Sequence, residues 1–488
     1  MSPYIVIAII AAYFAIIFAV SYFSARKSST SDFFRGGNSS PWWVVAIGMI
    51  GTTLSGVTFI SVPGMVAGAA KMTYFEVILG NFLGYILIMH FLLPLYYRLN
   101  LTSIYGYIQQ RIGHTSYKTS AILFLISKLI GAGFRLFIVA LVLQITVFQP
   151  LGLPFALNAI ISVFLIWAYT VKGGIKSIVW TDLIQTFFLV FAVIFTIFAI
   201  KDELGMSFLE MTSAIGSNSQ FQIFDFSNFW GNNNHFFKQF ISGAFITIVM
   251  SGLDQDMMQK NLSLKNLHEA KKNFLSFSIA FVPVNFIFLC LGVLFVIYMN
   301  QMGIAIPTKT DQIYPLLATN YLSYSVAIFF ILGIIASAFS SANSALIAMT
   351  TSFMVDIYGT KNKDERTLNR TRILVHTAMA ALLIGIVILF NAFNDDSVVN
   401  AIFKFAGYTY GPLLGLFVVG MFTKWNIRDR LVPIIATLSI ISTVLIDRFS
   451  VELLAGYKFG FEILLVNGAL TILGLLLCRT KSNNTDKT

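Results

Sequence analysis

Four serines share one face of an apolar segment, residues 313–352. Ser337, Ser340, Ser341 and Ser344 recur at i, i+3, i+4 and i+7, which places them on one side of an α-helix. A polar stripe in a long apolar helix faces protein or a cavity rather than lipid. Its hydroxyl oxygens can bind a small cation, or each can bond back to a carbonyl of its own helix. The spacing alone leaves both explanations open.

Glycines, hydroxyls and a proline interrupt a second apolar segment, residues 42–68. Its middle reads GTTLSGVTFISVPG from residue 51 to residue 64. Pro63 removes a backbone hydrogen bond and frees a carbonyl, and free carbonyls in broken membrane helices are typical sodium ligands. Small residues also let two helices cross closely, which is the alternative explanation.

A similar interruption, SGLDQD at residues 251–256, ends the apolar segment 236–257. Interrupted helices at matching positions in two halves of a chain point to a transport site near the middle of the membrane. We therefore predict a binding site between these two segments. The halves show no convincing sequence identity, so the repeat is inferred from the positions of the interruptions.

Charged residues inside the apolar segments are few. Arg135 lies roughly 20 Å into the segment 119–147 at 1.5 Å per residue, near the membrane midplane, and its planar guanidinium suits a carboxylate or phosphate; a structural ion pair is the alternative. Lys128 is shallower and is expected to reach the cytosolic interface. Asp182 is either a helix N-terminal cap or an ion ligand. Asp254 and Asp256 are expected to be solvated at the interface.

The elements that must hold these residues are membrane helices. The chain has 488 residues, of which 57% are apolar and 11% charged, whereas soluble domains carry roughly 25% charged residues. This composition excludes an ordinary soluble enzyme, a disordered chain and a nucleic-acid-binding domain. The sequence contains no His-Glu-x-x-His, Walker or Cys/His metal motif, so we expect no enzyme, no nucleic-acid partner and no obligatory protein partner.

Thirteen apolar runs are long enough to cross a bilayer, for which about 20 residues are needed. They are residues 4–24, 42–68, 74–97, 119–147, 155–171, 179–200, 236–257, 273–299, 313–352, 372–392, 398–422, 431–446 and 459–478. Alternate loops carry most of the 32 Lys and Arg residues, which predicts an outside N-terminus and a cytoplasmic C-terminus. Lys260 is assigned to one of these cytosolic loops.

The runs predict four regions in an all-α, multi-pass protein of the cell (inner) membrane. Residues 1–30 form an extra N-terminal span, 42–201 a first five-helix repeat and 236–422 a second five-helix repeat. Residues 431–488 form two additional spans and a short cytosolic tail. The N-terminal run lacks a basic start and a small-residue cleavage site, so it is expected to be a retained span rather than a signal peptide.

Five stretches, taken in order, resemble the sodium/solute symporter family over nearly the whole chain. They are DFFRGG (32–37), TSIYGY (102–107) with Arg111, GGIKSIVWTDLIQ (173–185), Asp254-Gln255 with Gln259, and GPLLGLF (411–417). The resemblance implies a leucine-transporter-type fold of two inverted five-helix repeats with sodium as the coupling ion. Within the family, the chain is most similar to bacterial sodium-coupled sialic acid transporters.

The same resemblance implies three sets of site residues. The principal sodium site would use carbonyls of Gly51, Leu54 and Ser337 and hydroxyls of Ser340 and Ser341, where Gly51 and Ser337 stand in place of the family's usual Ala. A second sodium site would use Asp182, Ser340, Asn343 and Ser344, where Asn343 replaces a Ser. The solute would be lined by Thr53, Ser55, Thr58, Asn81 and Arg135, with Asn81 in place of a Gln and with Arg135 binding the carboxylate.

The expected function is sodium-coupled import of a small organic solute, with an acidic sugar such as sialic acid as the first candidate. The first alternative is another carboxylate or a vitamin-type or other solute. A membrane sensor on a transporter scaffold and an ion channel are alternatives from other classes. A sensor is expected to carry a cytosolic signalling domain, and only about ten residues follow the last apolar run.

Overall fold

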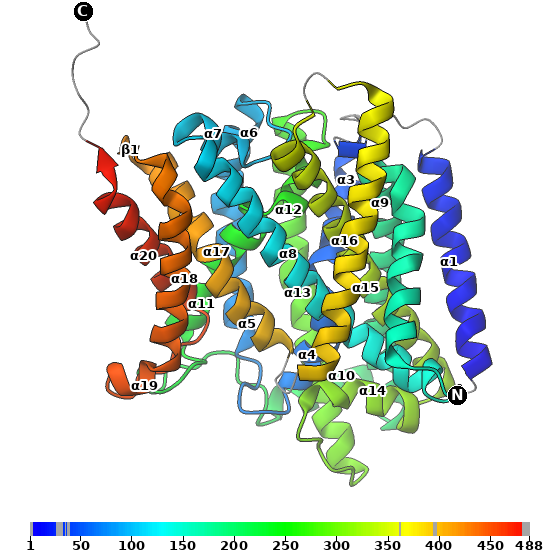
Figure 1. Cartoon of the computed structure of the whole chain (residues 1–488). Helices are drawn as coiled ribbons and strands as arrows, with labels where there is room; N and C mark the ends of the chain where they lie inside the picture. The colour runs from blue at the N-terminus through cyan, green and yellow to red at the C-terminus, as the bar shows by residue number, and fades with distance from the viewer. Residues whose placement is uncertain are drawn as a thin grey trace, which may run out of the picture.

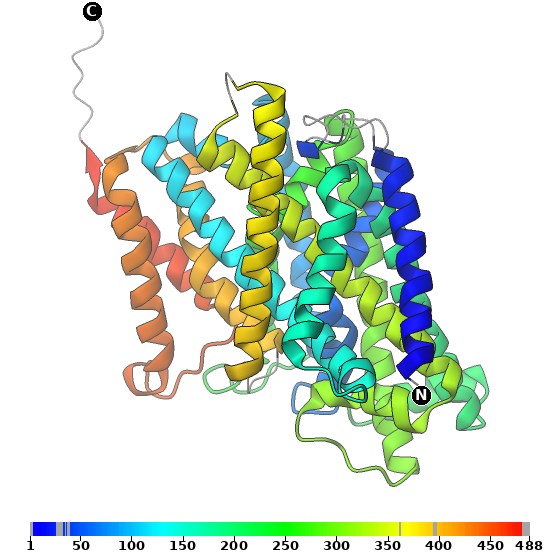
Figure 2. The same cartoon turned by 45° about the vertical axis from the view of Figure 1, so that its right-hand side comes forward.

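The computed structural model describes residues 3–25, 33–34, 36, 40–360, 363–393 and 398–480. Parts of the predicted N-terminal region (26–30), of the DFFRGG motif and of the predicted cytosolic tail (481–488) lie outside these residues. The described chain is almost entirely helical, and most of its long helices run between the two opposite faces seen at the top and bottom of Figures 1 and 2. An all-α membrane architecture is therefore confirmed.

The first half of the chain contains the first broken helix. Its elements are α1 (Pro3–Ala25), α3 (Trp42–Thr53), α4 (Gly56–Met65), α5 (Tyr74–Leu87), η2 (Ile88–Leu92), α6 (Leu93–Arg98), α7 (Gly106–Arg111), α8 (His114–Leu143), η3 (Gln144–Phe148), α9 (Phe155–Glu203) and α10 (Phe208–Ser217). Helices α3 and α4 meet at an angle of 56° across Leu54 and Ser55, which is the interruption expected in residues 42–68.

The second half begins with the other broken helix. Its elements are α11 (Phe236–Thr247), η4 (Ile248–Gly252), α12 (Gln255–Leu262), α13 (Leu267–Gln301), η5 (Thr310–Gln312), α14 (Ile313–Leu316), η6 (Leu317–Tyr321), α15 (Tyr324–Ser352), η7 (Phe353–Tyr358), α16 (Glu365–Phe393), α17 (Val398–Phe422), β1 (Asn426–Ile427), η8 (Asp429–Leu431), α18 (Val432–Arg448), α19 (Ser450–Leu453), α20 (Ile463–Leu477) and β2 (Arg479–Thr480). The segment α11–η4 and helix α12 are bent by 61°. Strands β1 and β2 form a short antiparallel pair.

The number of spans depends on how broken and kinked helices are counted. Within the described residues, nine helices are long and apolar enough to cross a membrane, or eleven if each bent pair is one span. Helix α9 has 49 residues and covers two of the predicted runs, with non-helical backbone angles at Gly174; a straight helix of that length would measure roughly 74 Å. Helix α20 has only 15 residues. The count of thirteen stays a prediction.

The two broken helices lie in different halves, and the second contacts the first half through glycines. A Cβ on Gly80 of α5 would lie 2.1 Å from the carbonyl oxygen of Phe240 in α11, and one on Gly243 of α11 would lie 2.3 Å from that of Val77. The backbones of α5 and α11 are therefore in direct contact, a close approach that small residues allow between membrane helices.

Replacing Gly80 with Val is expected to lower the free energy of unfolding by about 1–3 kcal/mol, the usual cost of overpacking. The reason is that the added carbons meet backbone atoms of α11, which cannot rotate away. Thermal unfolding of the purified protein measures the effect. Gly385→Ala in α16 is the matched control, because no atom lies within 4 Å of its added Cβ; an equal loss in both variants would contradict the prediction.

Candidate solute and sodium sites

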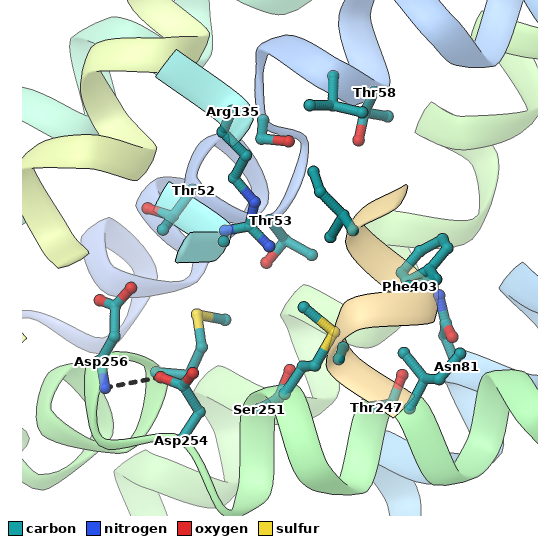
Figure 3. Close-up of a pocket in the computed structure, with 18 of the residues that line it drawn as sticks. Thr52, Thr53, Thr58, Asn81, Arg135, Thr247, Ser251, Asp254, Asp256 and Phe403 are labelled. Atoms are coloured by element: carbon teal, nitrogen blue, oxygen red, sulfur yellow. Dashed lines mark hydrogen bonds between the residues drawn. The ribbon is translucent and has the colours of Figure 1, made fainter. Parts of the chain in front are cut away.

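A central cavity lies between the two broken helices, α5, α8 and α17. It encloses about 1060 Å³ of empty space, part of it open to solvent. All five residues expected to line a solute, namely Thr53, Ser55, Thr58, Asn81 and Arg135, border this cavity. Figure 3 shows the Arg135 side chain extending toward Thr52 and Thr53 and Asn81 lying beside Thr247 on the opposite side. Helices α3, α5, α8 and α11, which are distant in the sequence, thus contribute to the lining of one cavity.

The lining is rich in groups that can hydrogen-bond. Besides the five residues above, its polar members are Thr52, Tyr74, Tyr85, Ser127, Lys128, Thr247, Ser251, Asp254, Asp256, Asn285 and Tyr410. Aromatic rings, including Phe281 and Phe403, complete it. Hydroxyls, amides and flat rings suit a small solute with many hydroxyl groups, since a few placed polar groups fix orientation within an otherwise apolar pocket.

Arg135 has no carboxylate partner within the described part of the chain, unlike Lys128, the other cation that borders the cavity. Its Nε–H is buried and donates no hydrogen bond to a described residue. Lys128, two turns earlier on the same face of α8, lies 3.1 Å from an Asp254 oxygen and 2.7 Å from an Asp256 oxygen. Arg135 is therefore the cation left available to an anionic ligand.

Three charged residues lie elsewhere than the sequence suggested. Lys128 does not reach the interface, and Asp254 and Asp256 are not solvated there: all three are buried. The hydroxyl of Tyr410 donates a further hydrogen bond to Asp254 at 2.7 Å. Burial of a charge is tolerated when it is paired and hydrogen-bonded, so the three residues hold one another in the wall of the cavity instead of facing water.

The residues expected to form the principal sodium site lie where α3 breaks against α15. Helix α3 ends at Thr53, so its last carbonyls lack the amide partners of a continuous helix. A Cβ on Gly56 would lie 3.5 Å from the Ser337 hydroxyl, which brings the break next to the serine stripe. The Ser337 hydroxyl is buried with no hydrogen-bond partner among the described residues. An unpaired hydroxyl oxygen thus lies beside the expected sodium ligands, although the Ser337 carbonyl, the expected ligand of this residue, accepts a hydrogen bond from Ser341.

The bonds of the serine stripe agree in part with each of the two sequence-based explanations. The Ser341 hydroxyl donates to the carbonyl of Ser337 in its own helix at 3.0 Å, which is the back-bonded state. The Ser340 hydroxyl instead donates to Asp182 of α9 at 2.9 Å. One serine is thus bonded within α15, and the next one joins α15 to α9.

Packing explains why Gly51 stands where the family usually has Ala. A Cβ at this position would lie 2.1 Å from the Thr186 hydroxyl oxygen and 3.2 Å from the Thr186 Cα in α9. The Thr186 hydroxyl is already used, because it donates to the carbonyl of Ile47 at 3.0 Å. Gly51 therefore lets α3 contact α9 directly, and its own carbonyl remains available.

Asp182 is the centre of a polar network rather than a helix cap. It lies in the interior of α9, fully buried, where it accepts hydrogen bonds from Ser340 at 2.9 Å, Asn343 at 3.4 Å and Ser344 at 3.5 Å. The four residues expected to form a second sodium site are thus brought together. The capping explanation fails because a cap must lie at a helix start, and the chain continues helically through Trp180 and Thr181.

The network contains one residue that the sequence did not indicate. Lys260 of α12 is 1% exposed, and its ammonium lies 2.6 Å from an Asp182 oxygen and 2.5 Å from the Thr52 hydroxyl. Its assignment to a cytosolic loop is therefore wrong. The available signal was its place six residues after Asp254, next to Gln259 of the family-like Asp254-Gln255 and Gln259 pattern.

The geometry can be compared with known proteins. The sodium:solute symporter family description matches residues 33–428. The chain belongs to this family. The sodium/sialic acid symporter NanT of Aliivibrio fischeri is 28% identical, covering 97% of this chain and 92% of its own. The sodium/sialic acid symporter SiaT of Proteus mirabilis is 27% identical, covering 88% and 87%.

The fold of this symporter is that of a solved relative. The substrate-bound, outward-open structure of a Na⁺-coupled sialic acid symporter superimposes with a TM-score of 0.82, at 21% identity and over 97% of each chain. Family membership makes this protein a multi-pass membrane transporter with sodium as its coupling ion.

Proposed function

We propose that this symporter imports a monoanionic, polyhydroxylated solute of the sialic acid type together with sodium. The observation that carries the proposal is Arg135, a cavity-lining cation without a carboxylate partner among the described residues. A bidentate guanidinium–carboxylate pair is strong and directional. The relatives named as sialic acid symporters and the hydroxyl-rich lining support the same solute.

Sodium is proposed to join the α3–α4 break to α15 through Gly51, Leu54, Ser337, Ser340 and Ser341. An ion that binds one conformation better than another shifts the equilibrium between them. The solute is proposed to lie next to this break, because Thr53 and Ser55 line the cavity and directly precede and follow Leu54, a proposed sodium ligand. Binding of the ion would thereby order the solute site and couple the two fluxes.

The proposed topology has thirteen spans, with residues 42–201 and 236–422 as inverted repeats flanked by 1–30 and 431–488. The described chain supports an odd number, because α1 begins and β2 ends at opposite faces of the molecule (Figure 1). The N-terminus is proposed to lie outside a bacterial inner membrane and the C-terminus in the cytoplasm. Labelling of single cysteines near each end from either side of intact cells tests this orientation.

Uptake of labelled N-acetylneuraminate into proteoliposomes tests the transport function. Uptake is expected under an inward sodium gradient and not in a potassium-only control. Uptake of a labelled monocarboxylate instead would favour the alternative carboxylate solute. Sodium binding without uptake of any solute would favour a sensor, and solute flux without sodium coupling would favour a channel.

A further inference from the structure

The Asp182 carboxylate is surrounded by polar side chains of the protein. Thr52, Ser340, Asn343, Ser344 and Lys260 all direct hydrogen-bond donors at its two oxygens, at distances of 2.6 to 3.5 Å. An ionised carboxylate offers about four lone-pair sites. Lys260 and Ser340 make the two short bonds, at 2.6 and 2.9 Å, so each carboxylate oxygen already accepts from a protein donor rather than facing an open position.

The strongest of these donors is itself a cation. The Lys260 ammonium makes an ion pair at 2.6 Å with both side chains at most 2% exposed. A buried anion needs a positive partner, and Lys260 supplies it permanently because it is part of the chain. A sodium ion on the same oxygens would lie within a few ångströms of the ammonium, where like charges repel strongly in a low-dielectric interior.

Asn343 directs a hydrogen-bond donor, and not its oxygen, at the Asp182 carboxylate. Its amide nitrogen points to Asp182 at 3.4 Å and to the Gln185 side-chain oxygen at 3.5 Å. Its amide oxygen, the atom that could bind a cation, has no partner among the described residues. The residues expected for a second sodium site are thus together, but their charges and donors do not fit a second sodium ion.

We propose that Lys260 is a built-in cation that takes the place of the second sodium ion. This symporter therefore binds one sodium ion, and removal of the Lys260 ammonium would create a site for a second one. The proposal deepens the proposed function, because it fixes how many ions accompany the solute. It also assigns α12 a role: this helix of the second half carries the cation to Thr52 of α3 and Asp182 of α9 in the first half.

Equilibrium binding of ²²Na⁺ to purified protein without any solute tests the inference. The wild type is expected to bind one sodium per chain and Lys260→Gln two. Lys260→Arg keeps the positive charge and is expected to bind one, and the double variant Lys260→Gln/Asp182→Asn is expected to return to one. Lys238→Gln is the matched control, because Lys238 is also a buried lysine near a carboxylate, 3.9 Å from Glu462. This variant is expected to bind one sodium ion per chain.

The result that overturns the inference is an unchanged sodium count in folded Lys260→Gln. A wild-type count of two also overturns it, and this measurement decides the matter if Lys260→Gln does not fold. The inference and the proposed function fail separately. A gain of one sodium in Lys260→Gln supports the built-in cation even if N-acetylneuraminate is not transported, and N-acetylneuraminate uptake can persist even if the count does not change.

Discussion

Replacing Arg135 with Gln is expected to lower uptake of the anionic solute by roughly thirtyfold or more while sodium binding is retained. Gln keeps a hydrogen-bond donor but removes the charge. Loss of one partner of a buried, hydrogen-bonded charge pair costs about 2–5 kcal/mol, and each 1.4 kcal/mol is tenfold. Initial uptake rates in proteoliposomes and ²²Na⁺ binding to the same preparation measure the two quantities.

Two further variants make the Arg135 result specific. Arg135→Lys keeps the charge without the planar fork, so it is expected to recover only part of the uptake. Arg370→Gln removes a positive charge from an exposed position of α16 and is expected to transport normally. Normal uptake by Arg135→Gln would remove Arg135 from the solute site and would leave the monoanionic character of the solute without support.

Ser340→Ala and Ser341→Ala are each expected to raise the sodium concentration for half-maximal uptake by roughly tenfold. Each variant deletes one hydroxyl oxygen from the proposed ion site, and an unsatisfied buried polar partner costs about 1–3 kcal/mol. The effect is read from sodium activation curves at a fixed solute concentration. The maximal uptake rate is expected to change by a smaller factor than the sodium concentration for half-maximal uptake.

The matched control for the serines is Ser278→Ala. The Ser278 hydroxyl in α13 is also buried and bonds back to a carbonyl of its own helix, that of Phe274, but it does not border the cavity. If the stripe were only back-bonded, all three variants would behave alike. Unchanged sodium activation in both Ser340→Ala and Ser341→Ala would rule out the proposed ion site.

Sequence reasoning predicted the residues whose position depends on a single element. The four serines of α15 share a face because a helix fixes the spacing between them. An interruption of the segment 42–68 was predicted from its glycines, hydroxyls and Pro63. The break lies at Leu54 and Ser55, whereas Pro63 lies inside α4 and does not make it. Arg135 was found because a permanent charge deep in an apolar run must have a partner or a ligand.

The charged residues whose positions were predicted wrongly form ion pairs with residues of other helices, far away in the sequence. Lys128 and Asp254 are 126 residues apart, and Lys260 and Asp182 are 78 apart. The positive-inside rule counts a lysine near a segment end as a loop charge, and it contains no information about pairing. The same limit explains Asp182, where a local capping rule was applied to a helix that continues through the residue.

Helix α12 is short and polar, and yet residues 255–261 of it are buried. Its polar side chains are attached to different elements. Gln255 bonds to the backbone before α7, Gln259 to Thr351 of α15 at 2.9 Å, and Lys260 to α3 and α9. The preceding residue, Asp254, is held by α8 and α17.

A segment attached in this way cannot slide or rotate gradually. A shift of one turn would break several buried polar contacts at once, and each group left unpaired is costly in the interior. Packed elements with such contacts tend to have two discrete arrangements rather than a continuous range. Any change in the position of α12 would therefore have to break and re-form its buried polar contacts together, and such a change is expected to have few intermediate positions.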